Sequence, residues 1–132
     1  MPQDSVRTVE RLYEAWARGE SPGPPELLDP DIEYVNPDGA IEPGTRRGLE
    51  AFGAAIDTLL EGWSRWEMEP EGYTAVADRV AVVVRYRATA RASGMEVEGR
   101  ESALLTVRNG RIVRYEWFHG PDDALRALGL AD

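Results

Sequence analysis

The sequence predicts an α+β domain in which helices pack on one face of a curved antiparallel sheet. Apolar residues recur mainly at every third or fourth position before Gly62 and at every second position after it, which indicates helices first and strands later. The order is helix, strand, helix and then a meander of strands. A length of 132 residues fits one core, so residues 1–132 are predicted to form a single domain.

The first predicted helix begins near Asp4 or Ser5, which are both good N-cap residues. Apolar side chains follow at helical spacing until Arg18-Gly19 supplies a C-cap signal. These apolar residues are Val6, Val9, Leu12, Tyr13 and Trp16. The segment is therefore expected to be an amphipathic helix.

A proline-rich break at Ser21 to Pro25 follows this helix, and Pro25 is a good start for a short helical turn through Leu28. Residues 31–36 alternate as a strand that stops at Pro37. The residues that predict the next turn are Gly39, Pro43 and Gly44. This strand end places Tyr34 and Asn36 side by side, where the wall of a small-molecule pocket could be built.

A second helix is expected from about Leu49 to Leu60, with Gly62 closing it. The meander then begins with the alternating Trp66 and Met68 and continues through residues 80–86. The remaining expected pieces are hairpin turns at 77–79 and 108–110, strands at about 96–108 and 112–118, and a short helix after Gly120-Pro121.

The composition excludes several classes of function. A net charge of -9 argues against nucleic acid as a partner, and no apolar run approaches the ~20 residues of a membrane span. The N-terminus lacks a basic flank and an apolar core, so no secretory signal is expected and a cytoplasmic location is predicted. One histidine, no cysteine and no phosphate-binding loop predict neither a metal site nor a cofactor.

The order of several short motifs resembles a known superfamily. These motifs are Tyr13-Glu14-Ala15-Trp16 with Gly19, Tyr34-Val35-Asn36-Pro37-Asp38-Gly39 leading to Gly48, Asp78-Arg79-Val80, Gly110-Arg111-Ile112-Val113, and Trp117-Phe118-His119 with Asp123-Ala124-Leu125. Together they resemble the proteins that include nuclear transport factor two, ketosteroid isomerase, SnoaL-type polyketide cyclases and limonene epoxide hydrolase. The resemblance covers Val6 to Leu130. It implies a cone-shaped sheet wrapped around the N-terminal helices, and a homodimer paired through the sheet.

The mechanisms of two of these families do not transfer directly. The resemblance to ketosteroid isomerase puts Asn36 where the isomerase has its proton-shuttling aspartate, and an amide is no general base at neutral pH. The isomerase's oxyanion hole pairs a tyrosine with a protonated aspartic acid, and the nearest candidates for that pair here are Tyr13 and Glu101. An ungapped comparison instead puts Leu12 and Ala103 at those places.

Limonene epoxide hydrolase has a water-positioning Tyr-x-Asn pair that Tyr34 and Asn36 match. Its two catalytic aspartates, however, fall on Arg87 and Trp117, and only the arginine of that site has a counterpart, in Arg85. Epoxide hydrolysis by that route is therefore not expected.

His119 and Glu101 are the candidate catalytic residues. His119 is the single histidine and could act as a base, or it could cap the last helix. Glu101 shares the apolar face of its strand, so it is either a pocket acid or the ion-pair partner of Arg85 or Arg87. The arginines themselves could bind an acidic ligand or form a solvated or dimer-facing surface.

The aromatic residues could line a pocket for a flat ligand or could be core. The predicted ligand-binding residues are Tyr13, Trp16, Tyr34, Asn36, Trp63, Arg85, Tyr86, Tyr115 and Trp117. Three functions stay open: an isomerase, cyclase or hydrolase that transfers a proton on a small hydrophobic molecule, a non-catalytic binder of such a molecule, and a dimeric protein-interaction module.

Overall fold

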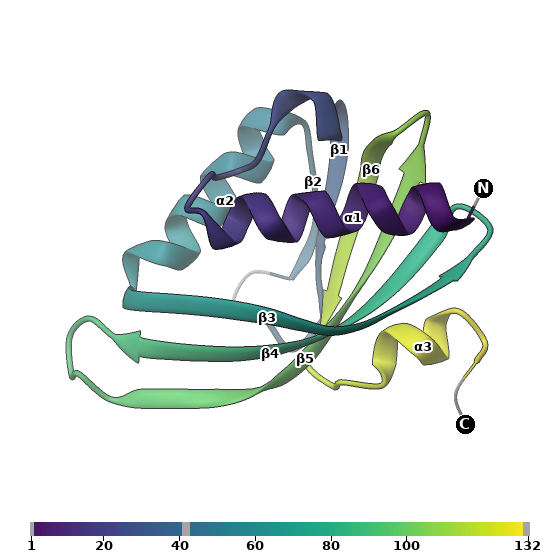
Figure 1. Cartoon of the computed structure of the whole chain (residues 1–132). Helices are drawn as coiled ribbons and strands as arrows, with labels where there is room; N and C mark the ends of the chain where they lie inside the picture. Colours follow the sequence, from purple (N-terminus) through teal and green to yellow (C-terminus); the bar gives the residue numbers. More distant parts are fainter. Residues whose placement is uncertain (1, 41–42, 131–132) are drawn as a thin grey trace.

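The computed structural model describes residues 2–40 and 43–130, and a six-stranded curved sheet forms its body (Figure 1). The strand order across the sheet is β2-β1-β6-β5-β4-β3. The strands are β1 (Leu28–Asn36), β2 (Gly44–Arg47), β3 (Trp63–Val76), β4 (Arg79–Ala90), β5 (Glu96–Arg108) and β6 (Arg111–Phe118). The helices are α1 (Pro2–Ala17), α2 (Leu49–Glu61), α3 (Asp123–Ala127) and the 3-10 turn η1 (Pro25–Leu27).

Helices α1 and α2 lie on the concave side of the sheet, as Figure 1 shows. The apolar stripe of α1 is buried there, and Val9 and Leu12 are fully inaccessible to solvent. Phe52 of α2 packs into the same core, which includes Ile32, Val82 and Leu105 of the sheet. The predicted α+β fold, with a curved sheet around the N-terminal helices, is confirmed. Among the described residues, no helix has the length and apolar composition that a bilayer crossing requires.

The sheet differs from the prediction in two features: it is not wholly antiparallel, and it has one more strand. Strand β1 pairs with β6 in parallel, so the sheet is mixed, while the meander β3-β4-β5-β6 is antiparallel as expected. The predicted turn after Pro37 contains the short strand β2, which pairs with β1 through Asn36 and Gly44. Residues 41–42 of that turn lie outside the described residues.

Helix α3 corrects the expectation that all helices pack on one face. It lies on the convex side of the sheet, opposite α1 and α2 (Figure 1). Ala124 of α3 and the following C-cap residue Leu128 bury against Ala81 and Leu104, which alternate with the inward residues of β4 and β5. The buried Ser102 hydroxyl donates to the Gly120 carbonyl at 2.6 Å and accepts the Ala124 N–H at 3.1 Å.

Irregular pairing in β3 decides which of its side chains face the concave side. Trp63 and Trp66 are three residues apart, so a regular strand would turn them to opposite faces. The register shifts between Trp63 and Arg65, so that Trp63 pairs with Ala90 and Trp66 with Ala88. A β-bulge of this kind returns both indoles to one face, beside α2.

Candidate functional site

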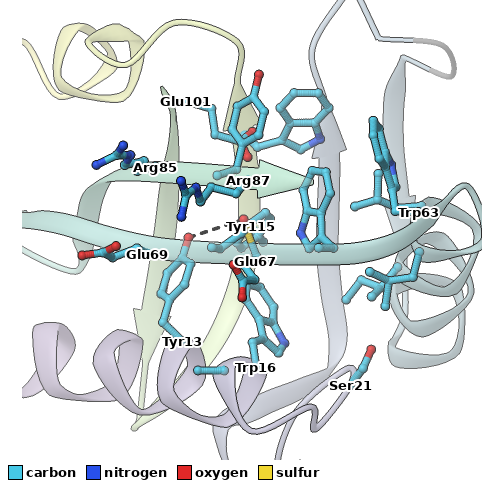
Figure 2. Close-up of a pocket in the computed structure, with 18 of the residues that line it drawn as sticks. Tyr13, Trp16, Ser21, Trp63, Glu67, Glu69, Arg85, Arg87, Glu101 and Tyr115 are labelled. Carbon is cyan, nitrogen blue, oxygen red and sulfur yellow. Dashed lines mark hydrogen bonds between the residues drawn. The ribbon is translucent and has the colours of Figure 1, made fainter. Parts of the chain in front are cut away.

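A cavity of about 940 Å³ lies between the concave face of the sheet and helices α1 and α2. Figure 2 shows Tyr13 and Trp16 entering it from α1 and Tyr115 from the sheet. Its volume is in the range of small-molecule sites. The predicted site residues that line it are Tyr13, Trp16, Tyr34, Trp63, Arg85, Tyr86, Glu101, Tyr115, Trp117 and His119. Asn36 is the predicted site residue outside this lining.

Tyrosine hydroxyls form the polar part of the inner cavity. The hydroxyls of Tyr13 and Tyr115 are hydrogen-bonded at 3.4 Å, as drawn in Figure 2, and either can be the donor. The ring of Tyr34 stacks on Tyr115 with centroids 5.8 Å apart. Burial raises the pKa of all these phenols above the ordinary value, so they stay protonated at neutral pH and can donate hydrogen bonds to a ligand.

Glu101 is the carboxyl group that acts on all three of these tyrosines. It lies on β5 opposite Val84 of β4, and its charge raises the pKa of Tyr13, Tyr34 and Tyr115. Desolvation raises the pKa of Glu101 itself to about 7. Its carboxyl forms no ion pair within the described residues, which favours a pocket acid over an ion-pair partner of an arginine. A carboxyl group with this pKa can accept or release a proton near neutral pH.

Arg85 and Arg87 lie on the other side of β4 from Tyr86. The pairs Arg85↔Arg100 and Arg87↔Glu98 face outward, and Arg87 makes an ion pair with Glu98 at 3.2 Å. Both arginines are exposed, although both are among the residues that line the cavity. This placement makes Arg85 a poor partner for a buried acidic group of a ligand.

His119 also lies at the margin of the cavity. Its exposed ring packs edge-on against Trp117, with centroids 4.9 Å apart, and lies beside the turn at Gly39. Ser102 of β5 pairs with Phe118 of β6 in an antiparallel register. One residue further along, the same register puts His119 across from Glu101. The Trp117 indole N–H donates to the side-chain oxygen of Asn36, so this amide orients the indole.

Half-buried apolar residues form the outer part of the cavity. They include Trp63 and Trp66 of β3 and Tyr86 of β4. The spacing of Trp66 in the sequence fits either a pocket or the core, and the structure places it in the lining of the cavity. The larger apolar residues of the lining that the sequence did not assign to the site are Phe52, Ile56, Leu59, Leu60, Met68 and Val97. Their helical or alternating spacing is the same signal that a core gives, so spacing alone could not assign them to a cavity.

The arrangement offers a carboxyl group that can exchange a proton near neutral pH, hydroxyl donors and apolar surroundings. In the described part of the chain, no group of three or more acidic or histidine side chains is placed to hold a metal ion. The chemistry that the lining residues themselves supply is proton transfer and hydrogen bonding.

Comparisons with known proteins agree with this architecture. The family model for the SnoaL-like domain matches residues 9–115. An uncharacterised protein of Mycobacterium tuberculosis is 30% identical over 121 residues, which are 91% of this chain and 92% of the relative. An NTF2-like protein of unknown function from Burkholderia pseudomallei has a TM-score of 0.79 at 25% identity, with 93% and 95% of the two chains covered. A putative SnoaL-like polyketide cyclase from Jannaschia has a TM-score of 0.78 at 22% identity, with 99% and 95% covered.

Proposed function

Because this chain belongs to the SnoaL-like domain family, we propose that it is an enzyme that moves a proton on a hydrophobic carbonyl compound held in the cavity. Glu101 is the proposed general base and acid. The Tyr13–Tyr115 pair is the proposed hydrogen-bond donor to the carbonyl oxygen, because one hydroxyl donates to the other and the second is left to donate to the ligand. Such a reaction is an isomerisation, or the enolisation step of a cyclisation.

The proposed step begins with the ionised Glu101 carboxylate, which takes a proton from the carbon next to the carbonyl group. The electron pair of the broken C–H bond moves to the oxygen, and an enolate forms. The phenol O–H that this pair leaves free stabilises the oxyanion, since a donor in a desolvated site interacts more strongly with developing charge. Glu101 then returns the proton to the same carbon or to another one.

One observation carries the proposal: Glu101 faces the cavity, beside tyrosine hydroxyls, with its pKa raised to about 7 by burial. A base works best when its pKa lies near the operating pH. An ion pair would instead lower the pKa of a carboxyl group, as Arg47 and Arg114 lower the pKa of Glu33.

The test is hydrogen–deuterium exchange at the α-carbon of 2-tetralone, an apolar ketone, followed by NMR. Glu101→Gln is expected to lower the enzymatic rate by about 10²-fold or more, the usual contribution of a general base. The matched control is Glu98→Gln, the same change on the outer face of β5, which is expected to leave the rate unchanged. Equal rates for wild type and Glu101→Gln would remove the assignment.

His119 is the second proposed catalytic residue, and its exposed position favours a smaller role than that of Glu101. In the same assay, His119→Ala is expected to reduce the rate less than Glu101→Gln does. A greater loss in His119→Ala would make the imidazole the base.

A non-catalytic binder is the second candidate function, favoured by the apolar character of the outer cavity. It predicts that 2-tetralone raises the melting temperature while the exchange rate equals that of buffer. A ligand at 100 times its dissociation constant adds about 2.7 kcal/mol to the free energy of unfolding.

A further inference from the structure

The last turn of α2 is held less firmly by the core than its first turn. Phe52 of the first turn is buried, with 1% of its surface exposed, whereas Leu59 of the last turn is 40% exposed. The other residues from 57 to 61 are exposed, except Leu60, which is half-buried. A segment with so few buried apolar contacts opens at a lower free energy than the core does. The end of α2 therefore depends on an attachment other than core packing.

The end of α2 also lacks the caps that a helix often carries in its own sequence. A helix leaves its last carbonyl groups without partners inside the helix, and a left-handed glycine or a basic residue in the last turn commonly satisfies them. Gly62, which follows α2, has a φ of -79°, and the last turn has no basic residue. The carbonyl groups at this end are therefore open to a donor from elsewhere in the chain.

Arg91, in the turn between β4 and β5, is that donor. Its Nε donates to the Glu61 carbonyl at 3.0 Å and its Nη2 donates to the Trp63 carbonyl at 2.9 Å. Its backbone N–H donates to the Gly62 carbonyl at 3.0 Å. One residue thus binds three consecutive carbonyl groups, an arrangement that we call the Arg91 clasp. The planar guanidinium group suits it, because its N–H groups point in fixed directions.

The clasp joins two walls of the cavity. One wall is α2, which contributes Ile56, Leu59 and Leu60, and the other is formed by β4 and β5, which contribute Tyr86 and Val97. Figure 1 shows the end of α2 and the β4–β5 turn at the same end of the molecule. The end of α2 cannot move away from this turn unless the hydrogen bonds of the clasp break.

We propose that the Arg91 clasp is a gate: while it is closed the last turn of α2 covers the cavity, and when its side-chain bonds break that turn moves away and a small molecule enters or leaves. Both side-chain bonds are exposed to solvent, so they can break while the core stays folded. The inference rests on the proposed function, because it assumes that the cavity holds a small molecule. It adds a conformational step and a residue outside the cavity lining that governs the rate of entry and exit.

The first test is amide hydrogen exchange of the protein without ligand, followed by NMR. Arg91→Ala is expected to speed exchange at residues 59–62 about tenfold and to leave residues 53–56 within about twofold of wild type. Arg91→Lys keeps the charge but loses the forked geometry, so we expect an intermediate effect of about threefold. Arg100→Ala is the matched control, because it removes an exposed arginine whose ion-pair partner is the Glu71 side chain and which does not line the cavity. It is expected to change neither region.

The second test measures the association and dissociation rate constants of 2-tetralone by NMR. Arg91→Ala is expected to raise both rate constants by about three- to tenfold and to change the dissociation constant by less than about twofold, because a gate that opens more often speeds entry and exit alike. A residue that merely shapes the site would instead change the dissociation rate and the affinity together. Arg100→Ala is again expected to match wild type.

Unchanged exchange at residues 59–62, or faster exchange throughout α2, would overturn the clasp and leave the proposed function in place. Faster exchange confined to residues 59–62 without a rise in both rate constants would overturn the gate. If wild type binds no 2-tetralone, the proposed function and the gate fail together. If Arg91→Ala does not fold, Arg91→Lys decides by the same criteria.

Discussion

Glu101 shows how one half-buried carboxyl group ties function to stability. Its alternation with Ala103 and Leu105 predicts from sequence alone that it faces inward. Sequence could not decide between a pocket acid and an ion-pair partner, because that choice depends on the face that Arg85 and Arg87 occupy. The pairing of β4 with β5 turns both arginines outward and leaves Glu101 among tyrosines.

The raised pKa of Glu101 predicts how the free energy of unfolding depends on pH. The ordinary pKa of 4.5 applies to the unfolded chain and the value of about 7 to the folded one, so the folded state binds the proton more tightly. The contribution of this group to stability is therefore largest below about pH 4.5 and is lost as pH rises through 7. Glu101→Gln removes this dependence and is expected to be more stable than wild type at pH 8, by about 1 to 3 kcal/mol.

Urea denaturation of both proteins at pH 5 and pH 8 measures this difference. Glu98→Gln, whose carboxyl is exposed, serves as the control. A difference between wild type and Glu101→Gln that does not grow from pH 5 to pH 8 would show that the pKa of Glu101 is not raised.

The Tyr13–Tyr115 pair predicts a second effect at the residue scale. Tyr13→Phe removes one hydroxyl of the pair and leaves its ring in place. We expect kcat for the exchange of 2-tetralone to fall about 10- to 100-fold with a small change in KM, since an oxyanion is stabilised more than a ketone. Tyr73→Phe is the control, because Tyr73 is half-buried beside the core but does not line the cavity. A Tyr13→Phe rate equal to that of Tyr73→Phe would exclude the donor role.

At the scale of elements, sequence pattern predicted most helices and strands and missed those whose position depends on a partner. Strands β4 and β5 were recognised because their inward residues alternate with outward ones. Strand β2 was missed because it is a short edge strand with mostly exposed residues and no apolar alternation. The side of the sheet that α3 covers was predicted wrongly, although the buried run from Ser102 to Val107 is the pattern of a strand covered on both faces.

Ser102 attaches α3 to the sheet, which leads to a prediction about this element. Ser102→Ala leaves the carbonyl of Gly120 and the buried N–H of Ala124 without the hydroxyl that both use. We expect the free energy of unfolding to fall by about 1 to 3 kcal/mol. The measurement is urea denaturation, with Ser64→Ala as the control at an exposed hydroxyl. A loss no larger than that of Ser64→Ala would show that Ser102 does not hold α3.

At the scale of the whole molecule, we propose that two copies pair through the outer face of the sheet, as the resemblance implies. That face has charged side chains in cross-strand ion pairs, such as Arg87–Glu98 and Arg100–Glu71. An interface built on charges weakens as salt screens them. Sedimentation velocity is therefore expected to show a dimer at low salt that dissociates at high salt. A monomer under both conditions would contradict this proposal.

The fold places the Glu101 carboxyl group, whose pKa burial raises, in the lining of the cavity, and the proposed activity depends on the proton that this group exchanges. The most direct measurement is the pH dependence of α-proton exchange of 2-tetralone catalysed by wild type and by Glu101→Gln. We predict that the wild-type rate rises with pH through about 7 and then levels, because the ionised carboxylate is the active form, and that Glu101→Gln shows no such rise. The same profile in both proteins would contradict the role of Glu101 as the base.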